Sequence, residues 1–463
     1  MANYDIAIIG GGPGGYVAAI RAAQLGKSVV LIEKERVGGL CLNWGCIPSK
    51  SLLWNAEVVN LVRDAETYGI AFDNVTFDMA KAIDRSRQIV DQMVKGVEFL
   101  LIKNRVRTII GEASFASPRK LRVRGMDEEI EARNVIIATG ARPKTLPGLA
   151  TDGETIIGSR EALELREMPE RVVIVGGGPI GVEFAQYWRA YGVDITILEL
   201  LDHLVPLEDE EISIQLERAY KKQGIKFFTG AQVAGATARN GRGTVTFTAK
   251  GKETELDADK VLIGIGFEAN VEGLRLDVAG VQLERAWVKT DDALKTTADG
   301  VYAIGDVTGR MNLAHVASAM GVMVVERLAG VESPPLDYVR LPRVTFSQPE
   351  VASVGLTERQ AHDAGYDVKT GKFPMRANGR AKAINQQDGL VKIVADAKTG
   401  ETLGIHIVGP LASEMLAEAS LGMTLEATPR ELGWTVAAHP TLGETVKEAA
   451  LAVHGEAIHF WTE

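Results

Sequence analysis

Cys41 and Cys46 are the only thiols among the 463 residues of the chain, and they stand five positions apart. Two thiols this close can form a disulfide that opens and closes during a reaction. A structural cross-link is the weaker interpretation for a long chain with so few cysteines. The other alternative is two buried thiols that act as small hydrophobic residues. We interpret the pair as a redox centre.

Helix geometry restricts how this pair can be held. A regular helix would separate the two positions by about 7.5 Å along its axis, whereas a disulfide needs Cα atoms within roughly 7 Å. If the pair is oxidised, residues 41–46 therefore cannot all lie in regular helix. Gly39 and Gly45 allow a distorted turn, and Pro48 suits the early part of a helix. A helix N-terminus favours the thiolate, which is typical of a reactive cysteine.

A second group of reactive residue types lies near the other end of the chain, in the segment His439-Pro-Thr-Leu-Gly-Glu444. The Glu444 carboxylate can hydrogen-bond the imidazole of His439, fix its tautomer and raise its basicity. These residues alone leave open whether His439 is a general base or a structural histidine.

The elements that must position these groups begin with a predicted strand over Asp5–Ile9, a helix over Tyr16–Leu25 and a strand over Val29–Ile32. Three glycines in GxGxxG spacing separate the first strand from the helix: Gly10, Gly12 and Gly15. The first makes a tight turn, the second lets the backbone approach a pyrophosphate, and the third allows close helix–strand packing. Glu33, 23 residues after the first glycine, can accept hydrogen bonds from a ribose. The alternative is a glycine-rich structural turn.

The same pattern recurs with a strand over Arg171–Val175, a helix over Val182–Tyr191 and a strand over Ile195–Leu198. Its glycines are Gly176, Gly178 and Gly181. Glu199 again stands 23 residues after the first of them. Two such units predict two dinucleotides, a flavin at the first, beside the cysteines, and a nicotinamide at the second. The Glu199 carboxylate would repel a 2′-phosphate, so we expect NAD rather than NADP.

Three further apolar strands end in glycine: Val135–Gly140, Val261–Gly266 and Val301–Gly305. Asp306 follows the third, where a carboxylate can bind a ribitol or ribose hydroxyl. A turn aspartate without a ligand is the alternative. Prolines near residues 143 and 334 suggest domain boundaries.

The composition argues against several functions. The net charge is −10 with no basic run, so nucleic acid is not expected as a partner. The first residues, Met1–Asp5, lack a basic region, so no signal peptide is expected. No apolar run reaches the roughly 18 residues of a membrane span. We expect a cytoplasmic protein of about three domains.

These motifs resemble the class I pyridine nucleotide-disulfide oxidoreductases, which are flavin-dependent. The resemblance covers essentially the whole chain and is most specific at Cys41–Lys50 and His439–Glu444. It implies an α/β fold with two Rossmann-like domains, for FAD and NAD, and an α+β C-terminal dimerisation domain. The implied division is residues 1–146 for the first part of the FAD domain, 147–269 for the NAD domain, 270–338 for a return segment completing the FAD domain, and 339–463 for the interface domain.

The resemblance also implies further site residues. On the flavin side these are Gly39, Lys50, Ala113, Thr139, Gly140, Asp306 and Ala314. On the nicotinamide side they are Ile180, Glu183, Val233 and Gly266. Lys50 and Glu183 would pair beside the reactive part of the flavin. No metal site is expected.

The implied activity is the oxidation of protein-bound dihydrolipoamide to lipoamide with reduction of NAD to NADH. The implied partners are a second copy of the chain and a lipoyl-bearing acyltransferase, or lipoyl carrier protein, of a 2-oxoacid dehydrogenase or glycine cleavage complex. Cys41 would exchange with the substrate and Cys46 would face the flavin. His439 of the partner subunit would be the base, oriented by Glu444.

The chain departs from the family pattern in three respects. Family members often carry an Arg and a Pro just after the second glycine-ended strand, where this chain has Gly266-Phe267-Glu268-Ala269-Asn270, and this affects the expected NAD contacts. Ala437 replaces a frequent second His, which weakens any proposal of a second base. Trp44 is bulkier than the usual residue between the cysteines and could affect access of the substrate.

Other activities fit less well. A glutathione-type reductase that uses NADPH is opposed by Glu199 and by Ile47-Pro48-Ser49. A mercuric reductase would need additional C-terminal thiols. A flavoprotein that senses or assembles without turnover is a different class, and His439 beside a complete disulfide motif argues against it.

Overall fold

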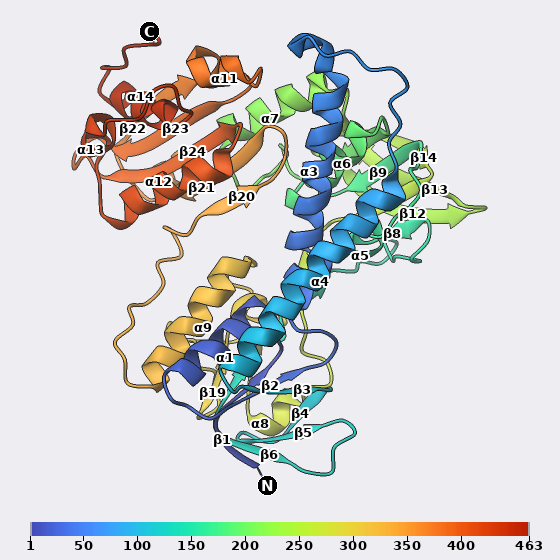
Figure 1. Ribbon diagram of the computed structural model, residues 1–463, viewed down its shortest axis with the longest axis vertical. Helices are drawn as coiled ribbons and strands as arrows, with labels where there is room; N and C mark the ends of the chain where they lie inside the picture. Colours follow the sequence, from blue (N-terminus) through green and yellow to red (C-terminus); the bar gives the residue numbers. More distant parts are fainter. Residues whose placement is uncertain (1, 462–463) are drawn as a thin grey trace.

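The computed structural model describes residues 2–461 and has three lobes (Figure 1). The lower lobe contains the N-terminal strand, the lobe at upper right contains the middle of the chain, and the lobe at upper left contains the C-terminal part. Two long helices, α3 (Cys46–Arg63) and α4 (Met79–Lys103), run between the lower lobe and the upper right lobe. The division into domains at the residues given above stays a prediction.

The lower lobe is built on a seven-stranded sheet of order β3-β2-β1-β6-β5-β4, with β19 beside β6. Its strands are β1 (Ala2–Ile9), β2 (Val29–Glu33), β3 (Arg107–Ile110), β4 (Ala113–Ser117), β5 (Lys120–Val123), β6 (Ile130–Ile137) and β19 (Val301–Ala303). Strands β1, β2, β3, β6 and β19 are parallel, so their carboxyl ends meet at one edge. The central strands are buried on both faces, as parallel strands usually are.

Helices α1 (Pro13–Gln24) and α9 (Ala314–Leu328) cover one face of this sheet (Figure 1). Ala18 and Ala22 of α1 pack in one buried core with Met320 and Val324 of α9. Helix α1 begins three residues earlier than the predicted helix, because Pro13 occupies its first turn, where the missing N–H costs nothing. The short helix α8 (Leu276–Ala279) packs in the core on the other face.

The second lobe repeats the arrangement with a five-stranded parallel sheet of order β11-β10-β9-β15-β8. Its strands are β8 (Ile156–Ile157), β9 (Arg171–Val175), β10 (Asp194–Leu198), β11 (Lys226–Phe228) and β15 (Lys260–Ile263). Its helices are α5 (Ser159–Ala162), α6 (Pro179–Ala190) and α7 (Glu210–Lys222). An antiparallel sheet of β12 (Gln232–Arg239), β13 (Arg242–Ala249) and β14 (Lys252–Ala258) is added to it. The pair β7 (Ala141–Pro143) and β16 (Phe267–Ala269) joins the two lobes.

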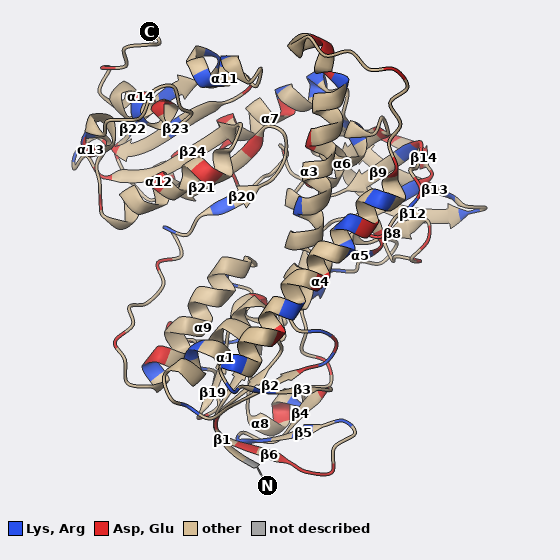
Figure 2. Ribbon diagram, viewed as in Figure 1, with Lys and Arg blue, Asp and Glu red and all other residues tan. Residues whose placement is uncertain are grey.

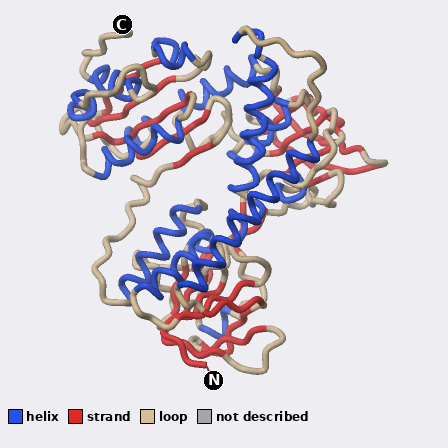
Figure 3. The backbone as a smooth tube through the Cα atoms, in the orientation of Figure 1, coloured by secondary structure: helices blue, strands red, loops and turns tan. Residues whose placement is uncertain are grey.

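The C-terminal lobe has a five-stranded antiparallel sheet of order β20-β21-β24-β23-β22. Its strands are β20 (Arg343–Thr345), β21 (Glu350–Gly355), β22 (Val368–Pro374), β23 (Leu390–Asp396) and β24 (Thr402–Gly409). Its helices are α10 (Glu358–Asp363), α11 (Gly379–Ala383), α12 (Ala412–Thr424), α13 (Pro429–Trp434) and α14 (Glu444–Val453). Figure 3 shows the extended loop, residues 329–342, that leads into this lobe from α9.

A buried ion cluster joins the C-terminal lobe to α7. Lys392 of β23 has 1% of its side chain exposed, and its Nζ lies 2.8 Å from Asp209, 2.9 Å from Glu211 and 2.6 Å from Glu358. His406 of β24 is fully buried beside this cluster. Because each charge has an opposite partner, the cluster satisfies the rule that buried charges are paired.

Charged residues of both signs are interspersed over all three lobes (Figure 2). Within residues 2–461, no helix is long and apolar enough to cross a membrane.

Candidate active site

Cys41 lies in α2 (Gly39–Trp44), Cys46 is the first residue of α3, and the two are joined by a disulfide. Their Cα atoms are 4.7 Å apart. Gly45 separates the two helices with φ −140° and ψ −112°, outside the helical region. The expectation that residues 41–46 cannot form one regular helix is therefore confirmed.

The redox segment rests directly on the first glycine loop. The N–H of Gly38 donates to the carbonyl of Gly11 at 2.8 Å. A Cβ added to Gly39 would lie 2.7 Å from the Cα of Gly12, so the two backbones touch and only glycine fits between them. The disulfide and the predicted flavin site thus belong to one structural unit.

The two glycine loops have the same geometry. Gly10 and Gly176 have φ of +105° and +110°, and a Cβ on either would collide with a backbone carbonyl, at 2.2 Å and 2.3 Å. A Cβ on Gly15 or Gly181 would lie 1.9 Å from the carbonyl oxygen of the first glycine in the same loop. A Cβ added to either of the remaining members, Gly12 or Gly178, would have no neighbour closer than 3.9 Å, so the side on which it would stand is open to a pyrophosphate.

The two acidic residues are also held alike. Glu33 accepts the N–H of Gly11 at 2.6 Å, and Glu199 accepts the N–H of Gly177 at 2.5 Å. Both carboxylates are 7% exposed. Each is therefore oriented by its own glycine loop, at the position from which it could bind ribose hydroxyls. These residues fit two bound dinucleotides.

Further predicted flavin-side residues gather at the same sheet edge. Thr139 and Gly140 follow β6, and Asp306 follows β19, the strand paired with β6 in parallel. Burial raises the pKa of Asp306 to about 6, as expected for a carboxyl group that a ligand hydroxyl would satisfy. Ala314 begins α9 behind this edge. Ala113 begins β4, two residues after Gly111, whose N–H donates to the carbonyl of Glu33 at 2.8 Å.

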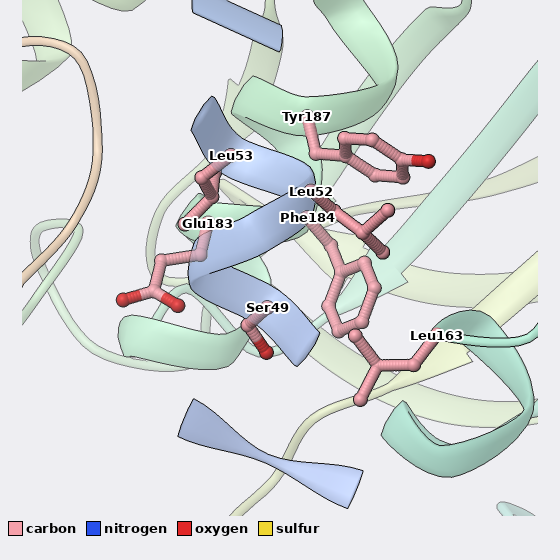
Figure 4. Close-up of a pocket in the computed structure, with 7 residues that line it drawn as sticks. All are labelled: Ser49, Leu52, Leu53, Leu163, Glu183, Phe184 and Tyr187. Atoms are coloured by element: carbon pink, nitrogen blue, oxygen red, sulfur yellow. The ribbon is translucent and has the colours of Figure 1, made fainter. Parts of the chain in front are cut away.

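Lys50 and Glu183 meet as predicted. Nζ of Lys50 on α3 lies 2.8 Å and 2.9 Å from the two carboxylate oxygens of Glu183 on α6. The N–H of Phe346 donates to Glu183 at 2.9 Å, and the Lys50 ammonium lies 4.5 Å from the Phe346 ring centre. Helices α3 and α6 pack closely beside this pair and leave a cavity of about 10 Å³, next to Leu52 and Phe184 (Figure 4).

The other nicotinamide-side residues lie around the second glycine loop. A Cβ added to Gly264 would lie 3.5 Å from the side chain of Ile180 in α6, and Gly266 follows with φ +104°. Val233 lies in β12, two residues after Ala231, whose N–H donates to the carbonyl of Glu199 at 2.8 Å. These residues therefore lie around the carboxyl ends of β9, β10 and β15, at one edge of the second sheet.

His439 and Glu444 form a hydrogen-bonded pair between α13 and α14. Nδ1 of His439 lies 2.9 Å from Oε1 of Glu444, whose Oε2 accepts the N–H of Thr441 at 2.9 Å. Burial raises the pKa of Glu444, but these two hydrogen bonds together with the nearby positive charge of the histidines outweigh burial and leave the pKa below its usual value. The carboxylate is therefore ionised and holds the imidazole.

The structure does not bring His439 to the disulfide of the same chain. Helices α13 and α14 lie at the outer left edge of the C-terminal lobe, whereas α3, which begins at Cys46, runs through the centre (Figure 1). The His439 side chain is 79% exposed.

Two residues in the segments that depart from the family pattern, Trp44 and Glu268, have partners of their own. The guanidinium of Arg160 on α5 lies 3.9 Å from the ring centre of Trp44 and 2.7 Å from Glu35. Glu268 pairs with Arg142 of β7 at 3.0 Å. The effect of Trp44 on substrate access stays a prediction.

The sequence interpretation missed Arg160, Phe346 and the pair of His459 with Glu448. Arg160 and Phe346 carry no local signal, because their contacts come from distant parts of the chain. The pair of His459 with Glu448 has only a partial signal. Glu448 follows Glu444 by one helical turn, but nothing local links it to His459.

Comparisons with known proteins agree with this fold. The family described as "Pyridine nucleotide-disulphide oxidoreductase" matches residues 4–321, and its dimerisation domain matches residues 341–450. The chain belongs to this family. It is 44% identical to "Dihydrolipoyl dehydrogenase" of Bacillus subtilis over 471 residues, which cover 99% of each chain.

Solved structures are similar along nearly the whole chain. LpdA from Mycobacterium tuberculosis superposes with a TM-score of 0.90 at 29% identity, covering 97% of this chain and 99% of that one. The HOCl-induced flavoprotein disulfide reductase RclA from Escherichia coli has a TM-score of 0.85 at 29% identity, covering 96% and 99%.

Proposed function

We propose that the protein is a dihydrolipoyl dehydrogenase, which oxidises dihydrolipoamide to lipoamide and reduces NAD to NADH. The observation that carries the proposal is the disulfide between Cys41 and Cys46, which is packed against the first glycine loop. The full-length similarity to a curated dihydrolipoyl dehydrogenase supports the choice of substrate.

The family uses FAD and NAD, and the residues fit both. Gly10, Gly12, Gly15, Glu33, Gly39, Lys50, Ala113, Thr139, Gly140, Asp306 and Ala314 would hold FAD. Gly176, Gly178, Ile180, Gly181, Glu183, Glu199, Val233 and Gly266 would hold NAD. When bound, the flavin accepts the electron pair of the dithiol and makes it available to NAD as a hydride.

The chain's own residues would handle thiols and protons. His439 takes a proton from one thiol of dihydrolipoamide, while Glu444 keeps the imidazole in the required tautomer. The resulting thiolate attacks Cys41, and Cys46 leaves as a thiolate. The second substrate thiol then displaces Cys41, so that lipoamide and a reduced cysteine pair result. Lys50 and Glu183 would fix the local charge beside the flavin site.

The active unit would be a homodimer. His439 is exposed and lies far from the disulfide of its own chain, and the dimerisation domain of the family covers residues 341–450. We propose that His439 of one subunit serves Cys41 and Cys46 of the other. A lipoyl-bearing acyltransferase or carrier protein as the docking partner, and a cytoplasmic location, are part of the same proposal.

The test is Cys46→Ser. This variant should lose NAD reduction by dihydrolipoamide but keep flavin and keep NADH oxidation by ferricyanide, which bypasses the disulfide. Oxidised glutathione with NADPH is the control substrate pair and should give little turnover with the wild-type protein. Near wild-type dihydrolipoamide turnover by the variant would refute the proposal.

A further inference from the structure

A second histidine–carboxylate pair lies on the same helix as the first. Nδ1 of His459 lies 2.8 Å from Oε1 of Glu448. Glu444 and Glu448 are four residues apart on α14, and side chains at this spacing are neighbours on one helix face, about 5–6 Å apart at Cβ. Helix α14 therefore holds two carboxylates in a row, and each binds an imidazole from a different loop.

Residues 458–460, the C-terminal segment, are anchored without the imidazole of His459. Oε2 of Glu448 accepts the backbone N–H groups of Ile458 at 2.9 Å and His459 at 3.2 Å. The Phe460 ring packs edge-on against Phe373, with 6.2 Å between ring centres. Only Oε1 of Glu448 is used by the imidazole, and the His459 side chain stays 70% exposed. An imidazole that is fixed at one nitrogen and open at the other suggests more than anchoring.

The hydrogen bond also sets the tautomer of His459. An ionised carboxylate can only accept, so Nδ1 carries the proton and Nε2 is the basic nitrogen. Burial raises the pKa of Glu448, but the hydrogen bonds from His459 and Ile458 outweigh burial and leave the pKa below its usual value. Glu444 and Glu448 stand one helical turn apart on α14, so the two pairs are close enough to interact.

We propose that His459 is a second proton acceptor of the dithiol reaction, beside His439 at the partner subunit's disulfide. This inference rests on the proposed function. The dithiol gives up two protons and two electrons, and NAD takes both electrons with one proton, so each turnover releases one proton. Nε2 of His459 accepts that proton and returns it to water. In this proposal, His459 takes the role of the second His that many family members carry where this chain has Ala437.

Other charged groups lie around this pair, and the variants compared in a pH experiment must all keep them. They are Glu444 and Glu448 on α14, Arg376, whose guanidinium lies 5.6 Å from the Phe460 ring, and the pair Arg430–Glu456 at 2.9 Å. The test therefore changes His459 alone.

The experiment compares His459→Asn with His459→Ala. The amide nitrogen of Asn can replace Nδ1 as the donor to Glu448 but carries no exchangeable charge, whereas Ala removes both. His459→Asn should lower kcat for dihydrolipoamide on the order of tenfold near pH 7, and change the pH profile. The loss is smaller than the ~10²–10⁴-fold effect of a positioned base, because water partly replaces the acceptor. Added imidazole buffer should restore part of the rate.

The controls are NADH oxidation by ferricyanide, flavin content, and His362→Asn at an exposed position in α10, all of which should be unchanged. If His459→Asn keeps the wild-type kcat and pH profile while His439→Gln loses activity, the inference fails and the proposed function stands. If the wild-type protein does not oxidise dihydrolipoamide at all, both fail.

Discussion

At the scale of single residues, the proposed chemistry depends on a few side chains that hydrogen bonds and the backbone hold in place. Cys41 and Cys46 stand five positions apart in the sequence, too far along a regular helix for a disulfide. The break at Gly45 could therefore be predicted from helix dimensions. The His439–Glu444 bond was predicted because both residues lie in one short segment. The pair of His459 and Glu448 was not, because it forms only when the C-terminal segment folds back along α14.

His439→Gln should lower dihydrolipoamide oxidation roughly 10²–10⁴-fold, the usual contribution of a positioned base. The amide can still contact Glu444 but cannot take a proton from a thiol. Steady-state rates with dihydrolipoamide and NAD measure the loss. The visible flavin spectrum should not change, and a loss of less than fivefold would remove His439 from the base role.

At the scale of elements, the two strand–loop–helix units are near copies in geometry. The roles of their glycines were predictable: a Cβ on the first or third glycine of each loop would collide with a backbone carbonyl, and the second leaves space for a pyrophosphate. The antiparallel sheet β12–β14 and helix α7 were not predicted, since their positions depend on packing against the second sheet. The break between α3 and α4 was also missed. Asp78 caps the start of α4 by accepting the N–H of Lys81 at 3.1 Å.

Glu199→Gln should raise the NADP to NAD ratio of kcat/KM by at least about fivefold, because two like charges 4 Å apart repel by about 1 kcal/mol even in water. The measurement is the rate with each nucleotide at saturating dihydrolipoamide. Glu33→Gln is the matched control, since its carboxylate is held identically in the first loop. Glu33→Gln should weaken FAD retention and leave the NADP to NAD ratio of kcat/KM unchanged. If both variants changed this ratio equally, the assignment of Glu199 to the NAD site would be contradicted.

At the scale of the whole molecule, stability should fall in acid because of the buried cluster between α7 and the C-terminal sheet. Burial lowers the pKa of His406 below 6.5. Burial raises the pKa of Asp209, but the charges of His406 and Lys392 outweigh it and lower that pKa below 3.8. In both cases the unfolded chain binds more protons than the native protein. Native stability therefore decreases as the pH falls, below about 6.5 for His406 and below about 3.8 for Asp209.

Urea unfolding at fixed protein concentration between pH 7 and 5.5 should show this loss, with a slope of up to about 1.4 kcal/mol per pH unit for one proton. His406→Gln keeps a donor for the Leu356 carbonyl, which Nε2 of His406 contacts at 2.9 Å, and should flatten the slope. His362→Gln, at an exposed site, should leave it unchanged. A slope that survives His406→Gln would assign the effect to other groups.

Mixed dimers test the division of the active site between subunits. In an equal mixture of Cys46→Ser and His439→Gln chains, half of the dimers are mixed, and each mixed dimer has one complete site. About one quarter of the wild-type activity should therefore appear after subunit exchange, although each parent is nearly inactive. Additive parental activities would show that each chain serves its own disulfide.

The exposed position of His439, far from the disulfide of its own chain, would also make activity depend on protein abundance if each site is shared between subunits as proposed. Below the dissociation constant of the pair, the concentration of complete catalysts falls with the square of the concentration of chains. Dilute samples would then remain folded and yellow while their specific activity declines, and a cell that halved its supply of this protein could lose more than half of its catalytic capacity.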